Sequence, residues 1–451
     1  MAQDLYTSCV SGLLFPLHER MKGHASVRVR RALERSQWFS AGALAELQVK
    51  RLRALLGSAR NHVPYYRDLF TRLGFDPAQL TSVDDLDRLP FLTKPIIRAN
   101  TERLKSAKAR GLIRFNTGGS SGEPLVFFMG RERVTHDVAA KWRATRWWGV
   151  DIGDREIVVW GSPVELGVQD RMRGLRDRLL RSELLPAFEM SDTKLAAFIA
   201  RIREQRPTML FGYPSALSHI ARHAQKLGVR LDDVGIRVAF VTSERLYEEQ
   251  RELIVHAFGC RVANGYGGRD AGFIAHECPA GGMHITAEDI VVEIIDVAGV
   301  AVPPGGAGEI VITHLATSDF PFIRYRTGDI GILDDRRCTC GRGLPLLREI
   351  QGRTTDFIVA HDGTVMHGLA LVYIMRDLPG IDAFRIVQEN LQLTRVELVA
   401  NALYGPQIEA KIVSGFRARL GASVRVAIDQ VDALEPEKSG KFRYVVSRVA
   451  A

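Results

Sequence analysis

The first quarter of the chain carries its apolar residues at a helical spacing. Residues 1 to about 110 are predicted to be mostly helical, and residues 41–60 place apolar side chains three and four positions apart before a Gly-Ser pair. From about residue 112 the pattern changes to two short apolar runs on either side of a Gly/Ser-rich stretch. This arrangement predicts two strands joined by a turn.

Helical and extended patterns alternate from residue 156 to residue 268. Residues 156–163 predict a buried strand, and helical stretches and further strands follow in turn. The alternation is typical of a mostly parallel sheet flanked by helices, in which ligands bind beyond the carboxyl ends of the strands. Polar or glycine-rich loops follow the predicted strands at residues 213–215, 242–244 and 266–268.

The rest of the chain predicts a strand-rich subdomain and then a separate small domain. Residues 285–335 contain mainly strands, whereas residues from about 352 carry their own αβ pattern with a hairpin turn at Asp362-Gly363. We therefore expect an α/β protein. Its large domain, residues 1–351, would contain N-terminal helices (1–110), helix-flanked sheets and a β-rich subdomain, and residues 352–451 would form a small α+β domain.

The composition is that of a globular protein with a large core. Of 451 residues, 46% are apolar and 25% are charged, and the net charge is +9. Such a charge suits nucleic acid, an anionic surface or a polyanionic small molecule. No nucleic-acid-binding module is recognisable, so we expect no nucleic-acid partner. The densest basic run, residues 27–35, predicts a solvated helix face, with contact to a membrane or nucleic acid as the alternative.

The cysteines and the N-terminus indicate a reducing compartment. Five cysteines in a chain of this length do not form a disulfide framework. The N-terminal apolar stretch follows Asp4 and is interrupted by polar residues, Gly and Pro, unlike a signal peptide. No stretch approaches the roughly 18 apolar residues of a transmembrane helix. We expect a cytoplasmic protein without a transmembrane segment.

The Gly/Ser-rich stretch "FNTGGSSGEP" (residues 115–124) is the first candidate for chemistry. Its small residues let backbone N–H groups approach phosphate oxygens, and Thr117, Ser120 and Ser121 add hydroxyl donors. The chain contains no P-loop motif, and no Rossmann fingerprint fits its context. Taken alone, the stretch is equally compatible with an ordinary hairpin turn.

Three further strings follow in order: "YRTGDIG" (325–331), "QGRTTDFI" (351–358) and "EPEKSGKFRY" (435–444). With the Gly/Ser loop, this set resembles the adenylate-forming superfamily of acyl-CoA ligases, adenylation domains and luciferases. The strings "HVPYYRDLF" and "GYPSAL" and the Cys-x-Cys-Gly-Arg of residues 338–342 look like its phenylacetate–coenzyme A ligase group and the capsular-polysaccharide-type relatives. The resemblance covers nearly the whole chain.

The resemblance implies an activity. Such enzymes join a carboxylate to the α-phosphate of ATP with Mg²⁺, expel pyrophosphate, and pass the acyl group to coenzyme A. The acid here would be a small molecule with an aromatic group. One alternative is transfer to an amine, which forms an amide in polysaccharide or secondary-metabolite biosynthesis. Another is a non-catalytic nucleotide-binding protein. The resemblance leaves a homodimer open.

The resemblance also implies residue roles. Asp329 would accept hydrogen bonds from both ribose hydroxyls, Arg353 would contact the ribose or phosphate, and Lys441 would reach in from the small, mobile domain to the reacting phosphate and carboxylate. Each residue also has an alternative without a catalytic role: Asp329 would cap a turn, Arg353 would form an interdomain ion pair, and Lys441 would be a solvated surface lysine. The remaining ATP-binding candidates are Thr117, Gly118, Gly119, Ser120, Ser121, Gly122, Tyr266, Gly267 and Gly268.

Two departures from the family pattern stand out. The usual Tyr-Gly-x-Thr-Glu is "YGGRD" here, so Asp270 would hold Mg²⁺ and Arg269 would reach the phosphates or the substrate carboxylate. Thr355 stands where an acidic hinge residue is frequent, so the domain rotation between half-reactions would be tuned differently.

Two more groups of residues complete the candidates. A structural Zn²⁺ would be bound by Cys278, His284, Cys338 and Cys340, with His276 as a substitute ligand and reduced structural cysteines as the alternative. The acyl pocket would be walled by Trp147, Phe211 and Tyr213, which are equally ordinary core residues. Lys141 or Arg143 would contact the anionic part of coenzyme A.

Overall fold

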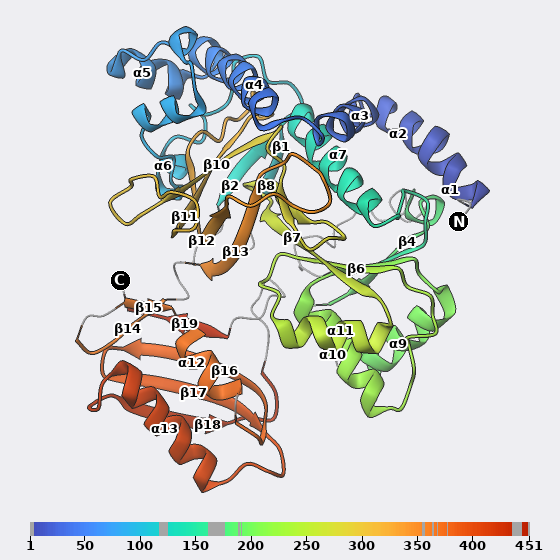
Figure 1. Cartoon of the computed structure of the whole chain (residues 1–451), viewed down its shortest axis with the longest axis vertical. Coiled ribbons are helices and arrows are strands. Elements are labelled where there is room, and N and C mark those ends of the chain that lie inside the picture. Colours follow the sequence, from blue (N-terminus) through green and yellow to red (C-terminus); the bar gives the residue numbers. More distant parts are fainter. Residues whose placement is uncertain are drawn as a thin grey trace. The chain divides into compact units, whose positions relative to one another are not determined.

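The computed structural model describes residues 4–116, 125–160, 176–187, 190, 192–353, 357–362, 365–367, 369–376, 378–434 and 444–449. The chain divides into two compact units, Met1–Gln351 and Gly352–Ala451. Both are drawn in Figure 1.

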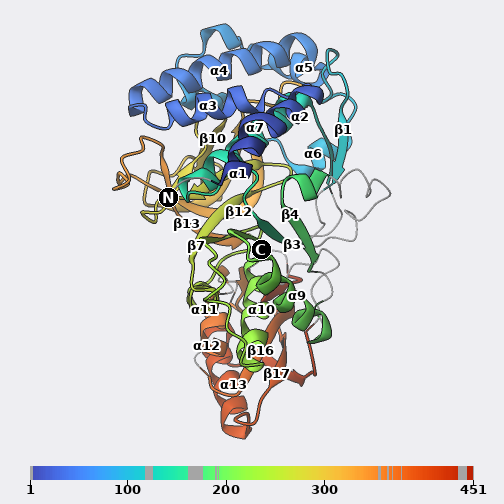
Figure 2. The same ribbon diagram turned by 90° about the vertical axis from the view of Figure 1, so that its right-hand side faces the viewer.

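Unit 1 begins with helices whose ends follow local capping rules. Ser40 caps the longest of them by accepting from the Ala43 N–H, and Gly74 ends the next in the left-handed conformation. The helices lie toward one side of unit 1 (Figures 1 and 2). They are α1 (Leu5–Cys9), the π-helical turn η1 (Val10–Leu14), α2 (Phe15–Met21), α3 (Ser26–Ser36), α4 (Ala41–His62), α5 (Pro64–Leu73), the 3₁₀ turns η2 (Pro77–Gln79) and η3 (Val83–Arg88), and α6 (Lys94–Ala99).

The strand pair expected around the Gly/Ser stretch is present. β1 (Ile113–Asn116) and β2 (Val126–Met129) pair antiparallel, with Ile113 opposite Met129. Residues 117–124, which connect them, lie outside the described residues.

The main sheet of unit 1 has the strand order β10-β11-β12-β13-β9-β8-β7-β6-β5-β3-β4. β3, β4, β5, β6 and β7 pair in parallel, and β7, β8 and β9 pair antiparallel. The predicted α/β fold with a helix-flanked sheet and a β-rich part is therefore confirmed. The strands are β3 (Glu156–Trp160), β4 (Ser182–Pro186), β5 (Met209–Gly212), β6 (Val238–Thr242), β7 (Arg261–Gly268), β8 (Gly272–Glu277), β9 (Met283–Ile285), β10 (Ile290–Ile295), β11 (Ala307–His314), β12 (Tyr325–Asp334) and β13 (Leu346–Arg353).

The parallel strands are buried because helices cover both faces. Every residue of β5 and β6 is buried, as near-continuous apolar runs predict for central parallel strands. On one face lie α9 (Asp192–Gln205), α10 (Pro214–Lys226) and α11 (Glu248–Phe258). On the other lies α7 (Arg131–Trp147), beside which Phe211 and Phe240 pack against Ala144 and Trp148.

In the residues that the structure describes, unit 2 contains a four-stranded sheet and two helices. Its strand order is β18-β17-β16-β19, and a separate hairpin pairs Phe357 with His367. Apolar side chains from the strands and the helices, such as Ile386, Leu398 and Phe416, are buried in one cluster. The elements are β14 (Phe357–Val359), β15 (Val365–His367), α12 (Leu369–Arg376), β16 (Ile381–Asn390), β17 (Leu393–Ala400), α13 (Pro406–Leu420), β18 (Arg425–Gln430) and β19 (Val445–Ser447).

Candidate functional site

The β7–β8 hairpin carries the "YGGRD" string, and its shape depends on glycine. A side chain at Gly267 would place its Cβ 2.1 Å from the carbonyl oxygen of Gly272, so only glycine fits there. Gly272 has a φ of +88°, which favours glycine as well. The register shifts between Tyr266 and Gly267, as in a bulge. The tight hairpin therefore holds Arg269 and Asp270 at its tip.

Tyr266 contacts Asp329 across the sheet. The Tyr266 Oη donates a hydrogen bond to Asp329 Oδ2 over 2.9 Å. In the strand order β7 and β12 are separated by β8, β9 and β13, so the sheet must curl to bring these side chains together. Both residues are half-buried.

The hydrogen bond that holds the Asp329 N–H goes to a threonine hydroxyl and does not use the Asp329 carboxylate. Its N–H donates to Thr327 Oγ1 over 3.1 Å, and the threonine hydroxyl donates to the Ile310 carbonyl over 2.7 Å. The carboxylate therefore reaches to another strand rather than capping its own turn. An ionised carboxylate in this position has the acceptors that two ribose hydroxyls need.

Asp270 is held from two sides. The buried Tyr325 donates its Oη to Asp270 Oδ2 over 2.6 Å. Arg133 of α7 donates to the backbone carbonyls of Arg269 and Asp270 over 3.3 and 3.4 Å, and its Nε donates to Asp137 over 2.8 Å. The hairpin tip is thus tied to α7 and to β12.

Neither Arg133 nor Tyr325 was among the predicted site residues. Tyr325 opens the "YRTGDIG" string, so a sequence signal for it existed. Arg133 sits on a helix and binds backbone carbonyls that follow it by more than a hundred residues, which no local pattern reveals.

Burial lowers the pKa of the Arg269 guanidinium from its ordinary value.

Several predicted residues lie outside the described residues. They are Thr117, Gly118, Gly119, Ser120, Ser121, Gly122, Thr355 and Lys441. Arg353 ends β13, and its side chain is also outside the description. The assignment of these residues to ATP and to the reacting groups stays a prediction.

The structure brings Cys278, His284, Cys338 and Cys340 together. One ligand atom from each lies within 4.8 Å of all the others. The Cys278 and Cys338 Sγ atoms are 3.6 Å apart, and His284 Nε2 is 3.2 Å from Cys340 Sγ. Bonds of about 2.3 Å to a tetrahedral Zn²⁺ separate two sulfurs by roughly 3.8 Å. The donor set and its spacing therefore fit zinc.

Burial and hydrogen bonds set the protonation of the cluster. Burial raises the pKa of the Cys278 thiol to about 12 and lowers the pKa of His284 to about 4. Burial also opposes ionisation of Cys340, but hydrogen bonds with Arg342, Cys338 and Cys278 together outweigh it and lower its pKa. His284 Nδ1 lies 3.3 Å from the Leu344 carbonyl, which leaves Nε2 directed at the cysteines, as second-shell bonds do at metal sites. A dication would supply the charge that ionises the buried thiol.

His276, the substitute ligand, is not part of the cluster. It lies directly opposite His284 in the β8–β9 ladder but packs on Phe273 and Phe240 instead. The reason is the strand order, because β13 follows β9 and not β8. The loop that carries Cys338 and Cys340 therefore reaches the strand of His284.

Trp147 lies beside this cluster. Its ring meets His284 edge to face, with centroids 5.6 Å apart, and its Nε1 donates to Gln37 Oε1 over 2.8 Å. The Arg342 guanidinium lies 4.5 Å from the ring centroid. These contacts connect the cluster to the N-terminal helices.

Phe211 and Tyr213 belong to a continuous series of aromatic contacts. Trp160 stacks on Tyr213 at 4.3 Å and on Phe211 at 5.9 Å, and Phe211 continues to Phe240. Lys141 Nζ lies 3.8 Å from the centre of the Phe211 ring. Phe211 and Tyr213 are buried, so their place in the acyl pocket stays a prediction.

The suggested contact of Arg143 with coenzyme A is wrong. The side chain is 1% exposed, and its Nη1 lies 2.7 Å from Glu288 Oε1, whose side chain is also fully buried. Helix packing rather than solvent surrounds this guanidinium. Lys141 is half-exposed and remains the candidate of the two.

Known proteins resemble this chain in sequence. Residues 358–448 match the family model described as the CapK C-terminal domain. The chain is 22% identical over 451 residues to Protein CapK of Staphylococcus aureus, covering 99% of this chain and 97% of that protein. It is 27% identical over 339 residues to a phenylacetate–coenzyme A ligase of Pseudomonas putida, covering 73% and 75%.

Solved structures share the fold. A 2-hydroxyisobutyryl-CoA ligase in the postadenylation state matches with a TM-score of 0.74 at 22% identity, covering 92% of this chain and 91% of that one. The amide bond synthetase McbA of Marinactinospora thermotolerans matches with a TM-score of 0.51 at 19% identity, covering 73% and 68%. The chain is thus similar in sequence to CapK and to phenylacetate–coenzyme A ligases, and it shares the fold of the 2-hydroxyisobutyryl-CoA ligase.

Proposed function

We propose that the protein is an ATP-dependent, AMP-forming ligase that activates a carboxylic acid as its acyl-adenylate and transfers the acyl group to coenzyme A. The observation that carries the proposal is the paired contact of Tyr266 with Asp329 and of Tyr325 with Asp270. It sets two carboxylates on the curled sheet of an adenylate-forming fold. The phenylacetate–coenzyme A ligases among the relatives support the acid and coenzyme A as substrates.

In this proposal the two carboxylates bind different parts of Mg²⁺-ATP. Asp329, oriented by the Tyr266 hydroxyl, accepts from the ribose hydroxyls. Asp270, oriented by Tyr325, supplies carboxylate oxygen to Mg²⁺, which prefers such ligands. Arg269 beside it would neutralise phosphate or substrate carboxylate charge.

The loop at residues 117–122 would hold the leaving pyrophosphate, and Arg353 and Lys441 would complete the site from the chain that follows β12. A lysine suits the last role because the charge at the α-phosphate and the carboxylate changes during the reaction, and a positioned cation stabilises that change. These roles rest on the family resemblance.

The cysteine–histidine cluster would hold a structural Zn²⁺. With four protein ligands no coordination position remains for water, so the metal would supply cross-linking rather than catalysis. It would fix the β8–β9 turn to the β12–β13 loop, and these strands flank Asp270 and Asp329. All five cysteines are free, which fits the proposed cytoplasmic location.

The acid is proposed to be aromatic because Phe211, Tyr213 and Trp147 offer aromatic walls. ATP–pyrophosphate exchange over a panel of carboxylic acids tests the first half-reaction, and mass spectrometry of the product with coenzyme A tests the second. Exchange with none of the acids would leave the non-catalytic alternative standing.

Transfer to an amine is the second candidate. It is favoured by the match to CapK over almost the whole chain and by the shared fold of an amide bond synthetase. The same assay separates the two candidates: exchange that occurs without thioester formation, followed by an amide product when amines are added, identifies the amine acceptor.

A further inference from the structure

The N-terminal helical segment formed by α1, η1 and α2 presents an apolar stripe to solvent. Leu5, Leu13, Leu17 and Met21 are 87%, 62%, 54% and 80% exposed. The opposite face packs on unit 1 through residues such as Val10 and Phe15, which are 0% and 6% exposed. A surface helix of a globular protein normally places polar side chains outward, so this segment has an apolar outer face that the fold does not use.

The backbone keeps the stripe aligned. The residues of the stripe and the exposed Cys9 recur every four residues. On a regular α-helix this spacing would move each successive side chain about 40° around the helix axis. The π-helical turn Val10–Leu14 has more residues per turn, so it rotates the following side chains back toward the same face. Leu179, whose carbonyl accepts from Tyr6 Oη over 3.0 Å, is a further apolar side chain near this segment and is 48% exposed.

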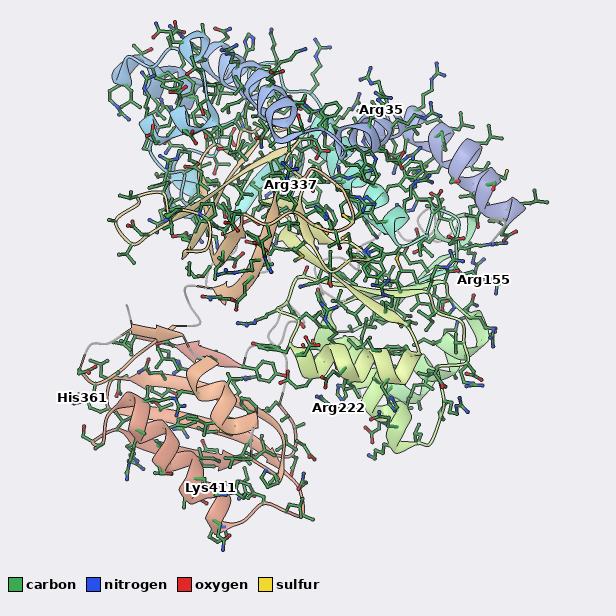
Figure 3. All side chains as sticks on the ribbon, in the orientation of Figure 1. Arg35, Arg155, Arg222, Arg337, His361 and Lys411 are labelled. Carbon is green, nitrogen blue, oxygen red and sulfur yellow. The ribbon has the colours of Figure 1, made fainter. Side chains whose placement is uncertain are left out.

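Within α1, η1, α2 and α3 the exposed charged side chains are all basic, and the exposed Asp4 that caps α1 is paired with Arg181. Glu19 is buried against Ser26, and Glu34 is engaged by Arg30 and Arg146. Arg35 points outward from α3 in Figure 3. The exposed cations between Leu5 and Ser36 are Arg20, Lys22, Arg28, Arg31 and Arg35.

The combination of apolar stripe and basic surroundings selects the partner. In a symmetric dimer the same patch would face itself, and the cations of one copy would oppose those of the other. Nucleic acid would match the cations and leave the apolar stripe uncovered. A bilayer with anionic headgroups offers both an apolar layer and negative charge.

We propose that the α1–η1–α2 segment binds the interface of an anionic membrane, with its helix axis along the membrane surface, Leu5, Leu13, Leu17 and Met21 in the acyl layer, and the arginines of α3 at the headgroups. Within the part of the chain that the structure describes, no helix is long and apolar enough to cross a bilayer, so the attachment is peripheral. The inference does not depend on the proposed ligase activity.

Cosedimentation of the full-length chain with vesicles tests the proposal. We expect binding to vesicles of equimolar phosphatidylglycerol and phosphatidylcholine, weaker binding at high salt, and none to phosphatidylcholine alone. The double variant Leu13→Gln/Leu17→Gln should lower the partition coefficient at least about tenfold, because it removes apolar area from the membrane-facing side. The triple variant Arg28→Gln/Arg31→Gln/Arg35→Gln should lower it by a similar factor.

Matched controls keep the test specific. Leu227 and Leu403 are 50% and 70% exposed elsewhere, and Leu227→Gln/Leu403→Gln should bind vesicles like the wild type. Unchanged partition of the Leu13/Leu17 variant, or no cosedimentation of the wild type with either vesicle, overturns the proposal. So does a wild-type dimer in sedimentation velocity that the Leu13/Leu17 variant dissociates, because a second copy would then cover the stripe.

Discussion

The Tyr266 hydroxyl donates to the Asp329 carboxylate over 2.9 Å although β8, β9 and β13 separate their strands in the sheet. The curl of the sheet thus fixes the acceptor proposed for the ribose hydroxyls relative to the hairpin that carries Asp270. A substitution on either strand should therefore weaken the use of ATP more than the use of the acid.

Asp329→Ala should lower kcat/KM for ATP by about 30- to 100-fold, because a charged hydrogen-bond acceptor contributes about 2–3 kcal/mol. Tyr266→Phe should cost about fivefold, since the carboxylate remains and only its orienting donor is lost. Initial rates of ATP–pyrophosphate exchange measure both. Tyr65→Phe on α5 is the matched control. An unchanged KM for ATP in Asp329→Ala would show that the ribose role is wrong.

Asp270→Asn should raise the Mg²⁺ concentration for half-maximal exchange at least about tenfold, because a neutral amide is a weaker ligand than a carboxylate. Asp270→Glu keeps the charge and should stay much closer to the wild type. The measurement is the exchange rate against free Mg²⁺ at saturating ATP. A Mg²⁺ dependence of Asp270→Asn that matches the wild type would remove Asp270 from the metal.

Purified protein should contain about one zinc per chain, and Cys338→Ser should lose it together with several degrees of melting temperature. Elemental analysis and thermal unfolding of the same samples measure both quantities. Cys9→Ser, at an exposed cysteine outside the cluster, should change neither. Folded wild-type protein that is free of metal would refute the site.

The sequence predicted elements better than contacts. Apolar runs predicted the strands β5 and β6, and the structure shows both to be buried, because a strand covered on both faces has little room for polar residues. The choice between His276 and His284 could not be made in the same way. Each lies near Cys278 in the chain, and only the order of β13, β9 and β8 brings one of them to Cys340.

The sequence indicated candidate site residues where a motif contains them. Tyr266, Asp270 and Asp329 lie in strings whose order is specific, whereas Arg133 and Gln37 act through contacts that join distant elements. For Arg143 the sequence suggested a ligand contact where the structure has a buried ion pair. A helical arginine is normally exposed, and the buried Glu288 that pairs with it lies in a loop far along the chain.

Arg143→Met should destabilise the protein by about 3–5 kcal/mol, because it leaves the Glu288 carboxylate buried without its ion-pair partner. The double variant Arg143→Met/Glu288→Leu should recover much of this loss, since both charges are removed together. Urea denaturation measures the free energy of unfolding. Arg203→Met, in the exposed pair with Asp233, should cost less than about 1 kcal/mol. Equal losses in the single and double variants of the buried pair would contradict its electrostatic role.

The pair of His136 and Asp289 should make stability depend on pH. Burial lowers the pKa of His136, but Asp289, whose Oδ1 is 2.9 Å from His136 Nδ1, outweighs it, and the net pKa is raised. Burial opposes ionisation of Asp289, yet His136 and Arg51 hold its pKa well below the usual range, so Asp289 stays charged at neutral and mildly acidic pH. Protonated His136 therefore stabilises the fold below its unfolded pKa, and this contribution is lost as pH rises through the folded pKa.

The test is the difference in unfolding free energy between the wild type and His136→Gln, which should be larger near pH 5.5 than near pH 8.5. His219→Gln is an informative control, because burial lowers the pKa of His219. Protonation of His219 therefore destabilises the folded state, and the wild type should lose stability relative to His219→Gln as pH falls. A His136 difference that is flat with pH, or that grows as pH rises, would show that the ion pair with Asp289 does not contribute to stability.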